Sequence, residues 1–105
     1  MVDLKELQKE VYQNKVNKGF NVTDINQVFC YIYSEVSEAY DAWYKEKDGL
    51  GEELADIAIY VLGLSEILGI NLEDEIQKKI YKNSQREYKI IDGRPIRVKE
   101  FNQKK

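Results

Sequence analysis

The chain has 105 residues, of which 43% are hydrophobic and 33% are charged, and its formal net charge is -3. This length favours one small domain and excludes two, and no stretch approaches the roughly 20 consecutive apolar residues of a membrane-spanning helix. The sequence has no histidine and one cysteine. Ser-His-Asp and Cys-His catalysis, histidine-containing zinc sites and an intramolecular disulfide are therefore excluded. Any metal site needs oxygen ligands, which favour Mg²⁺, Mn²⁺ or Ca²⁺.

The first predicted helix spans about residues 3–18. Its apolar positions recur near one face: Leu4, Leu7, Val11 and Val16. Gly19 follows directly, and a glycine after the last turn can take the left-handed conformation that ends a helix. We therefore expect an amphipathic helix that stops at Gly19.

The second predicted helix spans about residues 24–47. Asp24 and Gln27 have the spacing of a capping box at its start. Apolar residues then recur three and four apart, which is a helical period: Ile25, Val28, Phe29, Ile32, Val36, Ala39, Tyr40 and Trp43. Cys30 lies inside this stretch, and we expect its side chain in the core.

The third predicted helix spans about residues 51–68 and stops at Gly69. One apolar stripe follows the helical period: Leu54, Ile57, Ala58, Val61, Leu64 and Leu68. Further apolar residues lie on the other faces: Ala55, Ile59 and Leu62. A helix that is apolar most of the way round is buried on both sides, so we expect a second subunit against it.

A fourth helix is predicted from Asn71, its capping residue, to about residue 86. The following segment fits either a short hairpin around Asp92 and Gly93 or an irregular tail, because Pro95 cannot donate to a strand ladder. Together these elements predict an all-α, four-helix bundle-like domain over residues 1–87 that assembles as an oligomer. A basic tail over residues 88–105 completes the chain.

Two pairs of acidic residues lie inside the second and third predicted helices: Glu35 with Glu38, and Glu53 with Asp56. Residues three apart are neighbours on a helix surface, and each pair borders an apolar stripe. Antiparallel packing of the two helices would bring all four carboxylates together. Their mutual repulsion would then favour a divalent cation, which uses the oxygens as ligands.

The same spacing is common on solvated helix faces, and Asp3 and Glu6 show it in the first helix without any role that we assign. In the fourth predicted helix, Lys79, Asn83 and Arg86 fall on one face. An ammonium, an amide and a guanidinium in line suit a phosphate chain, although an ordinary polar surface has the same pattern.

These motifs together resemble the MazG-type all-α nucleotide pyrophosphohydrolases, whose members hydrolyse dUTP, dCTP or phosphoribosyl-ATP. The family signature is E-x-x-E followed after a dozen or more residues by E-x-x-D, and a later helix carries Lys, Asn and often Arg. The matching residues here are Glu35, Glu38, Glu53 and Asp56, then Lys79, Asn83 and Arg86. The turn Lys18-Gly19-Phe20 is also similar to family members, and the likeness extends over about residues 4–86.

The resemblance implies a Mg²⁺-dependent enzyme, with Mn²⁺ as a substitute, that cleaves nucleoside triphosphates between the α and β phosphates. It also implies a homodimer or a homotetramer with sites near subunit contacts. We expect the four carboxylates to hold the metal, with Glu38 as the candidate general base. Phe20 and Trp43, with Lys18 nearby, are candidates for contact with the nucleobase.

The charges and the fold leave two other functions open. Residues 1–77 carry 6 basic and 16 acidic side chains, whereas residues 78–105 carry 10 basic and 3 acidic ones. A basic C-terminal part can bind nucleic acid, although the overall acidity argues against it. A helical adaptor without enzymatic activity is the other alternative. The charged N-terminus lacks the apolar stretch of a signal peptide, so we expect a cytoplasmic location without membrane attachment.

Overall fold

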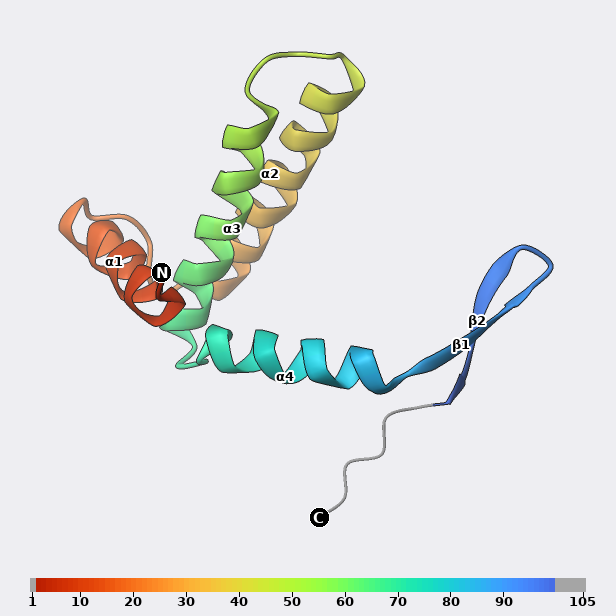
Figure 1. The fold of residues 1–105 in the computed structure, drawn as a ribbon. Helices are drawn as coiled ribbons and strands as arrows, with labels where there is room; N and C mark the ends of the chain where they lie inside the picture. Colours follow the sequence, from red (N-terminus) through yellow and green to blue (C-terminus); the bar gives the residue numbers. More distant parts are fainter. Residues whose placement is uncertain (1, 100–105) are drawn as a thin grey trace. The chain divides into compact units, whose positions relative to one another are not determined.

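The computed structural model describes residues 2–99. The elements follow one another in the order shown in Figure 1: α1 (Leu4–Asn17), α2 (Ile25–Tyr44), α3 (Leu50–Ile67), α4 (Leu72–Gln85), β1 (Glu87–Ile91) and β2 (Arg94–Lys99). The chain forms two compact units, one ending at Leu72 and one beginning at Glu73, and each is described by itself. The four predicted helices are confirmed. Assembly into an oligomer and the predicted division at residue 87 stay predictions.

The helix ends follow from local backbone chemistry. Gly19 and Gly69 take positive φ angles of 72° and 70°, which confirms both predicted glycine stops. At the start of α2, the Asp24 side chain accepts a hydrogen bond from the backbone N–H of Gln27 at 3.2 Å. This contact is the half of the predicted capping box that satisfies a free helix N–H.

The end of α2 differs from the prediction, because the helix stops at Tyr44 and not near residue 47. Glu46 takes the left-handed conformation with φ 53°, although it is not a glycine. The N–H of Lys47 then bonds back to the carbonyl of Ala42 at 2.8 Å. This closing pattern satisfies carbonyls of the last turn and ends the helix one turn early.

The core of the first unit lies where α3 packs against both α1 and α2. Its most buried apolar residues come from α2 and α3: Val28, Ala39, Ala42, Leu62 and Leu64. Gly63 lets α1 approach closely, because an added Cβ there would lie 3.1 Å from Lys15 Cε and 3.2 Å from Val11 Cγ1. Among the described residues, no helix is long and apolar enough to cross a membrane.

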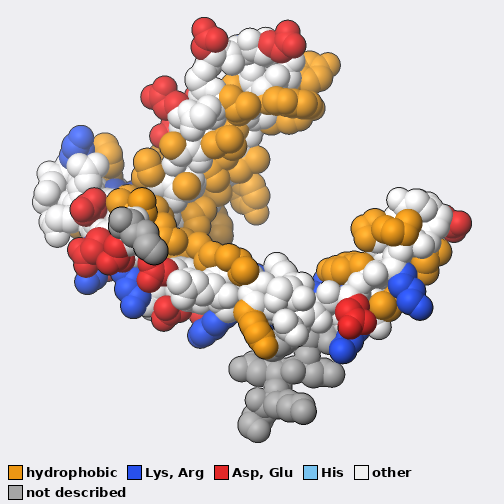
Figure 2. Space-filling model, in the orientation of Figure 1, with side chains coloured by type: hydrophobic (Ala, Val, Ile, Leu, Met, Phe, Trp, Pro, Cys, Tyr) orange, Lys and Arg blue, Asp and Glu red, His pale blue; other side chains and the backbone are white. Residues whose placement is uncertain are grey.

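Several residues predicted to be buried are exposed within the single chain. Cys30 is exposed, which contradicts its predicted place in the core. Val36 and Leu54, which belong to the predicted apolar stripes of the second and third helices, are also exposed, by 48% and 55%. The helical period was correct, but α2 and α3 meet along neighbouring faces, and these side chains point away from the contact. Figure 2 shows hydrophobic side chains exposed on the surface of the first unit.

The second unit contains α4 and an antiparallel hairpin of β1 and β2. Asp92 and Gly93 connect the strands with φ angles of 51° and 75°. Two consecutive positive φ angles are the requirement of the tight hairpin turn that follows the strand twist. Pro95 pairs with Ile90 in the register. Of the two alternatives for this segment, the hairpin is therefore the correct one.

Candidate functional site

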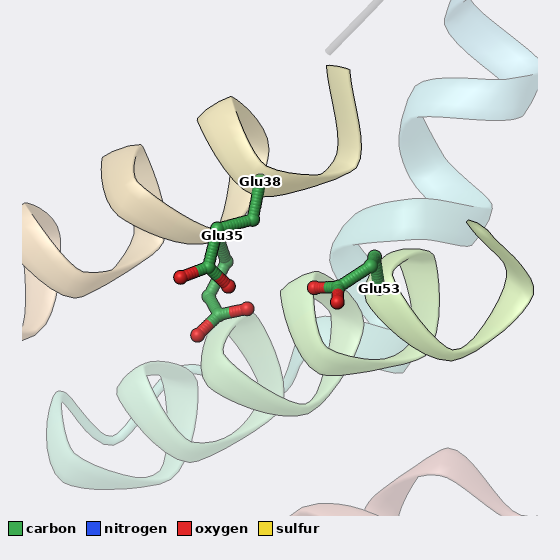
Figure 3. A group of neighbouring side chains, drawn as sticks. All are labelled: Glu35, Glu38 and Glu53. Carbon is green, nitrogen blue, oxygen red and sulfur yellow. The ribbon is translucent and has the colours of Figure 1, made fainter. Parts of the chain in front are cut away.

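Three of the four predicted carboxylates meet between α2 and α3. Glu35, Glu38 and Glu53 each offer an oxygen, and these oxygens lie within 4.8 Å of one another. Figure 3 shows the two side chains of α2 directed toward the one from α3. The predicted meeting of acidic groups from separate helices is thus present for these three residues, and below they are called the carboxylate cluster.

Glu35 reaches this position because it belongs to the buried face of α2. Val28, Ala39 and Ala42 are buried on that face, and Glu35 lies seven residues after the first of them, in the same heptad-like row. The sequence pattern had placed Glu35 at the border of the apolar stripe. The structure instead has this row running through Glu35, whose side chain is half-buried.

The carboxylate cluster is electrostatically unfavourable without a counter-charge. Burial raises the pKa of Glu35, and the neighbouring charges of Glu38, Asp56 and Glu53 raise it further. Burial is also the largest cause of the raised pKa of Glu53, followed by the charges of Glu38 and Asp56. Both effects disfavour the ionised carboxylate. A site made only of such groups favours either bound protons or a bound cation.

Two oxygens of the carboxylate cluster are also left without a partner. Oε2 of Glu35 and Oε2 of Glu53 are buried, and no hydrogen bond reaches them from the described part of the chain. A buried polar atom without a partner is costly, whereas a hard divalent cation takes carboxylate oxygens as ligands. The donor set, its oxygen chemistry and its orphaned atoms therefore fit a divalent metal ion.

The fourth predicted ligand, Asp56, links the carboxylate cluster to a pocket. Its charge acts on both Glu35 and Glu53, although it is not among the three residues whose oxygens lie closest. Asp56 also lines a pocket of about 680 Å³ within the first unit. This hollow, called the helical pocket below, is walled by residues of α1, α2 and α3 and by the turn after α1, among them Val11, Phe20, Val28, Tyr31, Ile59 and Tyr60.

Lys15, on α1, also lines this pocket. From the sequence, Lys15 could reach the site from the first helix, but a solvated surface was the favoured interpretation, and the structure instead leaves the residue only 8% exposed. Its Nζ lies 5.0 Å from the centre of the Tyr60 ring, and burial lowers its pKa. A glycine inside an otherwise apolar helix can signal close approach, and Gly63 against Lys15 was the available signal.

The three candidates for nucleobase contact lie in different places. Phe20 lines the helical pocket together with Asp56. Trp43 lines a separate hollow of about 400 Å³ beside the connection between α2 and α3. Lys18 is the exposed capping residue of α1. The structure therefore brings Phe20 to the pocket and does not bring the other two there, and the roles of all three stay predictions.

The predicted phosphate-binding residues belong to the second unit. Asn83 Oδ1 accepts a hydrogen bond from Nη1 of Arg86 at 3.0 Å, so the amide and the guanidinium are neighbours as their spacing predicted. Lys79 is exposed one turn before Asn83 on α4. A role for these residues opposite the carboxylate cluster stays a prediction.

Comparison with known proteins gives two matches. The sequence model of the MazG-like family matches residues 18–100. The fold is similar to that of a MazG-like pyrophosphohydrolase of cyanophage S-2L, whose structure is described as bound to dGDP and three catalytic Mn²⁺ ions per active site. The TM-score is 0.66 at 22% identity, over 94% of this chain and 100% of that one. No curated protein matches the chain.

Proposed function

The chain belongs to the MazG-like family, and from this premise we propose that it is a metal-dependent nucleotide pyrophosphohydrolase. The proposed substrate is a nucleoside triphosphate, cleaved between the α and β phosphates to a nucleoside monophosphate and pyrophosphate. The observation that carries this proposal is the carboxylate cluster, in which oxygens from two helices lie within 4.8 Å of one another. Two buried oxygens of this cluster have no hydrogen-bond partner among residues 2–99.

The metal ligands in this proposal are Glu35, Glu38, Glu53 and Asp56. Mg²⁺ is the proposed ion, with Mn²⁺ as a substitute, because both prefer carboxylate oxygens. When bound, the metal polarises phosphate oxygens and makes water a better nucleophile near neutral pH. The Mn²⁺ ions of the similar cyanophage protein support an ion of this class.

The protein side chains divide the remaining work. Glu38 is the exposed member of the carboxylate cluster, so it is the group best placed to accept a proton from an attacking water. Asp56 lines the helical pocket, so a nucleoside in that pocket would direct its phosphates toward the carboxylates. Lys79, Asn83 and Arg86 are proposed to neutralise and orient the phosphate chain.

Oligomeric assembly is part of the proposal, as a homodimer or a homotetramer in the cytoplasm. Its support is the apolar surface left on the single chain, where Tyr40 and Trp43 are 61% and 62% exposed. Contiguous exposed apolar residues of this size are typical of protein contacts. A second copy would bury them.

The test is a pyrophosphate-release assay over the canonical ribonucleoside and deoxyribonucleoside triphosphates, with Mg²⁺, with Mn²⁺ and with excess EDTA. We expect release from at least one triphosphate with either metal and none with EDTA. The result that would contradict the proposal is that no triphosphate is cleaved and that neither metals nor nucleotides change the melting temperature. The chain would then be a helical adaptor, and its exposed tyrosines and tryptophan would contact a protein partner.

A further inference from the structure

The helical pocket contains a buried cation that has no anionic partner. Lys15 is 8% exposed, and no carboxylate lies within ion-pair distance of it in the described part of the chain. Its stem rests on Gly63 and its ammonium lies over the Tyr60 ring. An aromatic face stabilises an ammonium only in part, and among the described residues no acceptor lies within hydrogen-bond distance of its N–H donors.

The position of Lys15 along α3 separates it from the carboxylates. Its neighbours Tyr60 and Gly63 follow Asp56 by four and seven residues, which is about 6 and 10 Å along the axis at about 1.5 Å per residue. Asp56, Tyr60 and Lys15 all line the same pocket. A nucleotide whose phosphates lie at the carboxylates would place its sugar between the two ends, and its base would reach the Lys15 end.

The walls of that end suit a nucleobase. Phe20 and Tyr31 present aromatic surfaces to the pocket, against which a flat base can stack. Asn14 and Gln27 also line it, and their side-chain amides have no partner in the described part of the chain. Apolar walls with a few convergent polar groups are the usual construction of a small-molecule site.

We propose that Lys15 is a specificity residue that donates to the exocyclic carbonyl of a nucleobase, so that the pocket prefers guanine and uracil or thymine over adenine and cytosine. This inference rests on the proposed function, since it takes the ligand to be a nucleotide. Guanine O6 and thymine O4 accept hydrogen bonds, whereas adenine and cytosine carry an amino donor at the same position. A buried donor left facing another donor loses its hydrogen bond, and this penalty produces selectivity.

Binding of nucleoside monophosphates tests the inference without depending on hydrolysis. We would measure the affinities of dGMP, dAMP, dUMP and dCMP by titration calorimetry in Mg²⁺ buffer, for wild type, Lys15→Met and Lys5→Met. Lys15→Met keeps an unbranched side chain as far as Cε and removes the ammonium donor. Lys5 is an exposed lysine of the same helix outside the pocket, so Lys5→Met is the matched control.

For wild type and for Lys5→Met we expect dGMP to bind about tenfold to 100-fold more tightly than dAMP, and dUMP more tightly than dCMP by the same factor. This factor corresponds to one charge-assisted hydrogen bond. Lys15→Met should lose the preference within each pair. It should melt at or above the wild-type temperature, because an unpaired buried ammonium is costly. A structural role alone would lower stability and leave the preference intact.

Gly63→Ala is a second variant that keeps the lysine and shifts it. The added Cβ would meet Lys15 Cε at 3.1 Å and Nζ at 3.3 Å, so the flexible end of the lysine must move. A reduced preference in this variant is expected. The inference is overturned if wild type binds none of the four monophosphates, shows no preference within either pair, or keeps its preference in Lys15→Met. Failure of pyrophosphate release with the preference intact would instead reject only the proposed function.

Discussion

The two ends of α3 differ in how they hold buried charge. At one end, Glu53 joins Glu35 and Glu38 in a cluster of like charges, two of whose buried oxygens have no hydrogen-bond partner in the described part of the chain. At the other end, Gly63 makes room for Lys15, a single cation over an aromatic ring. Asp56, beside the carboxylate cluster, and Lys15 line the same pocket, and this arrangement suits a ligand that brings a cation to the carboxylates and a hydrogen-bond acceptor to the lysine.

The largest expected effect is the loss of hydrolysis when one carboxylate of the cluster is neutralised. Glu38→Gln keeps the shape of the side chain and removes its charge, so we expect the rate of pyrophosphate release to fall by about 100-fold or more. The matched control is Glu6→Gln, which alters an exposed glutamate of α1 in a weak ion pair with Lys9. An unchanged rate in Glu38→Gln would remove this residue from the catalytic machinery.

The next effect is stabilisation by metal. A ligand at about 100 times its dissociation constant stabilises the native state by about 2.7 kcal/mol, which corresponds to a rise in Tm on the order of 10 °C for a domain of this size. We expect Mg²⁺ or Mn²⁺ to raise the Tm of wild type and of Lys15→Met equally. Glu53→Gln should lose most of the rise, as measured by thermal denaturation followed by circular dichroism. A full response in Glu53→Gln would contradict the shared site.

The stability of the metal-free protein should depend on pH through the carboxylate cluster. The pKa values of Glu35 and Glu53 are raised in the folded state, so the folded chain binds these protons more tightly than the unfolded chain. Their contribution to stability is therefore present below the unfolded pKa of about 4.3 and is lost as pH rises through the folded values. In EDTA, Glu35→Gln should flatten this decline and melt a few degrees above wild type at pH 7. If the melting temperatures of the two proteins change with pH in the same way, the carboxylates of the cluster do not destabilise the folded state.

The smallest expected effect compares two glycines of α3. Alanine is favoured over glycine inside a helix by up to about 1 kcal/mol. Gly51 has nothing within 4 Å of an added Cβ, so Gly51→Ala should raise the free energy of unfolding by part of this amount. At Gly63 the same gain is opposed by contacts with Val11 and Lys15, so no net stabilisation is expected. Equal gains at both positions in urea denaturation would mean that the Lys15 end is not tightly packed.

The sequence predicted best what depends on neighbouring residues. The glycine stops at Gly19 and Gly69 and the cap at Asp24 are local backbone effects, and all three are present. The meeting of Glu35 with Glu53 was also predictable, since a short connection forces α2 and α3 to pack antiparallel.

What depends on a distant partner was predicted poorly. The period of α2 identified apolar positions but did not say which face α3 covers, so Cys30 was wrongly placed in the core. Lys15 was wrongly favoured as solvated, because its environment is created by Gly63 and Tyr60, more than forty residues later in the chain. The spacing of charged residues on one helix carries no information about such a contact.

The central claim is that carboxylates of α2 and α3 share one divalent site, and Mn²⁺ binding followed by electron paramagnetic resonance tests it most directly. The account predicts that wild type binds at least one Mn²⁺ per chain, and that Glu35→Gln and Glu53→Gln, on separate helices, each weaken this binding by about tenfold or more. Unchanged Mn²⁺ affinity in either variant would contradict it.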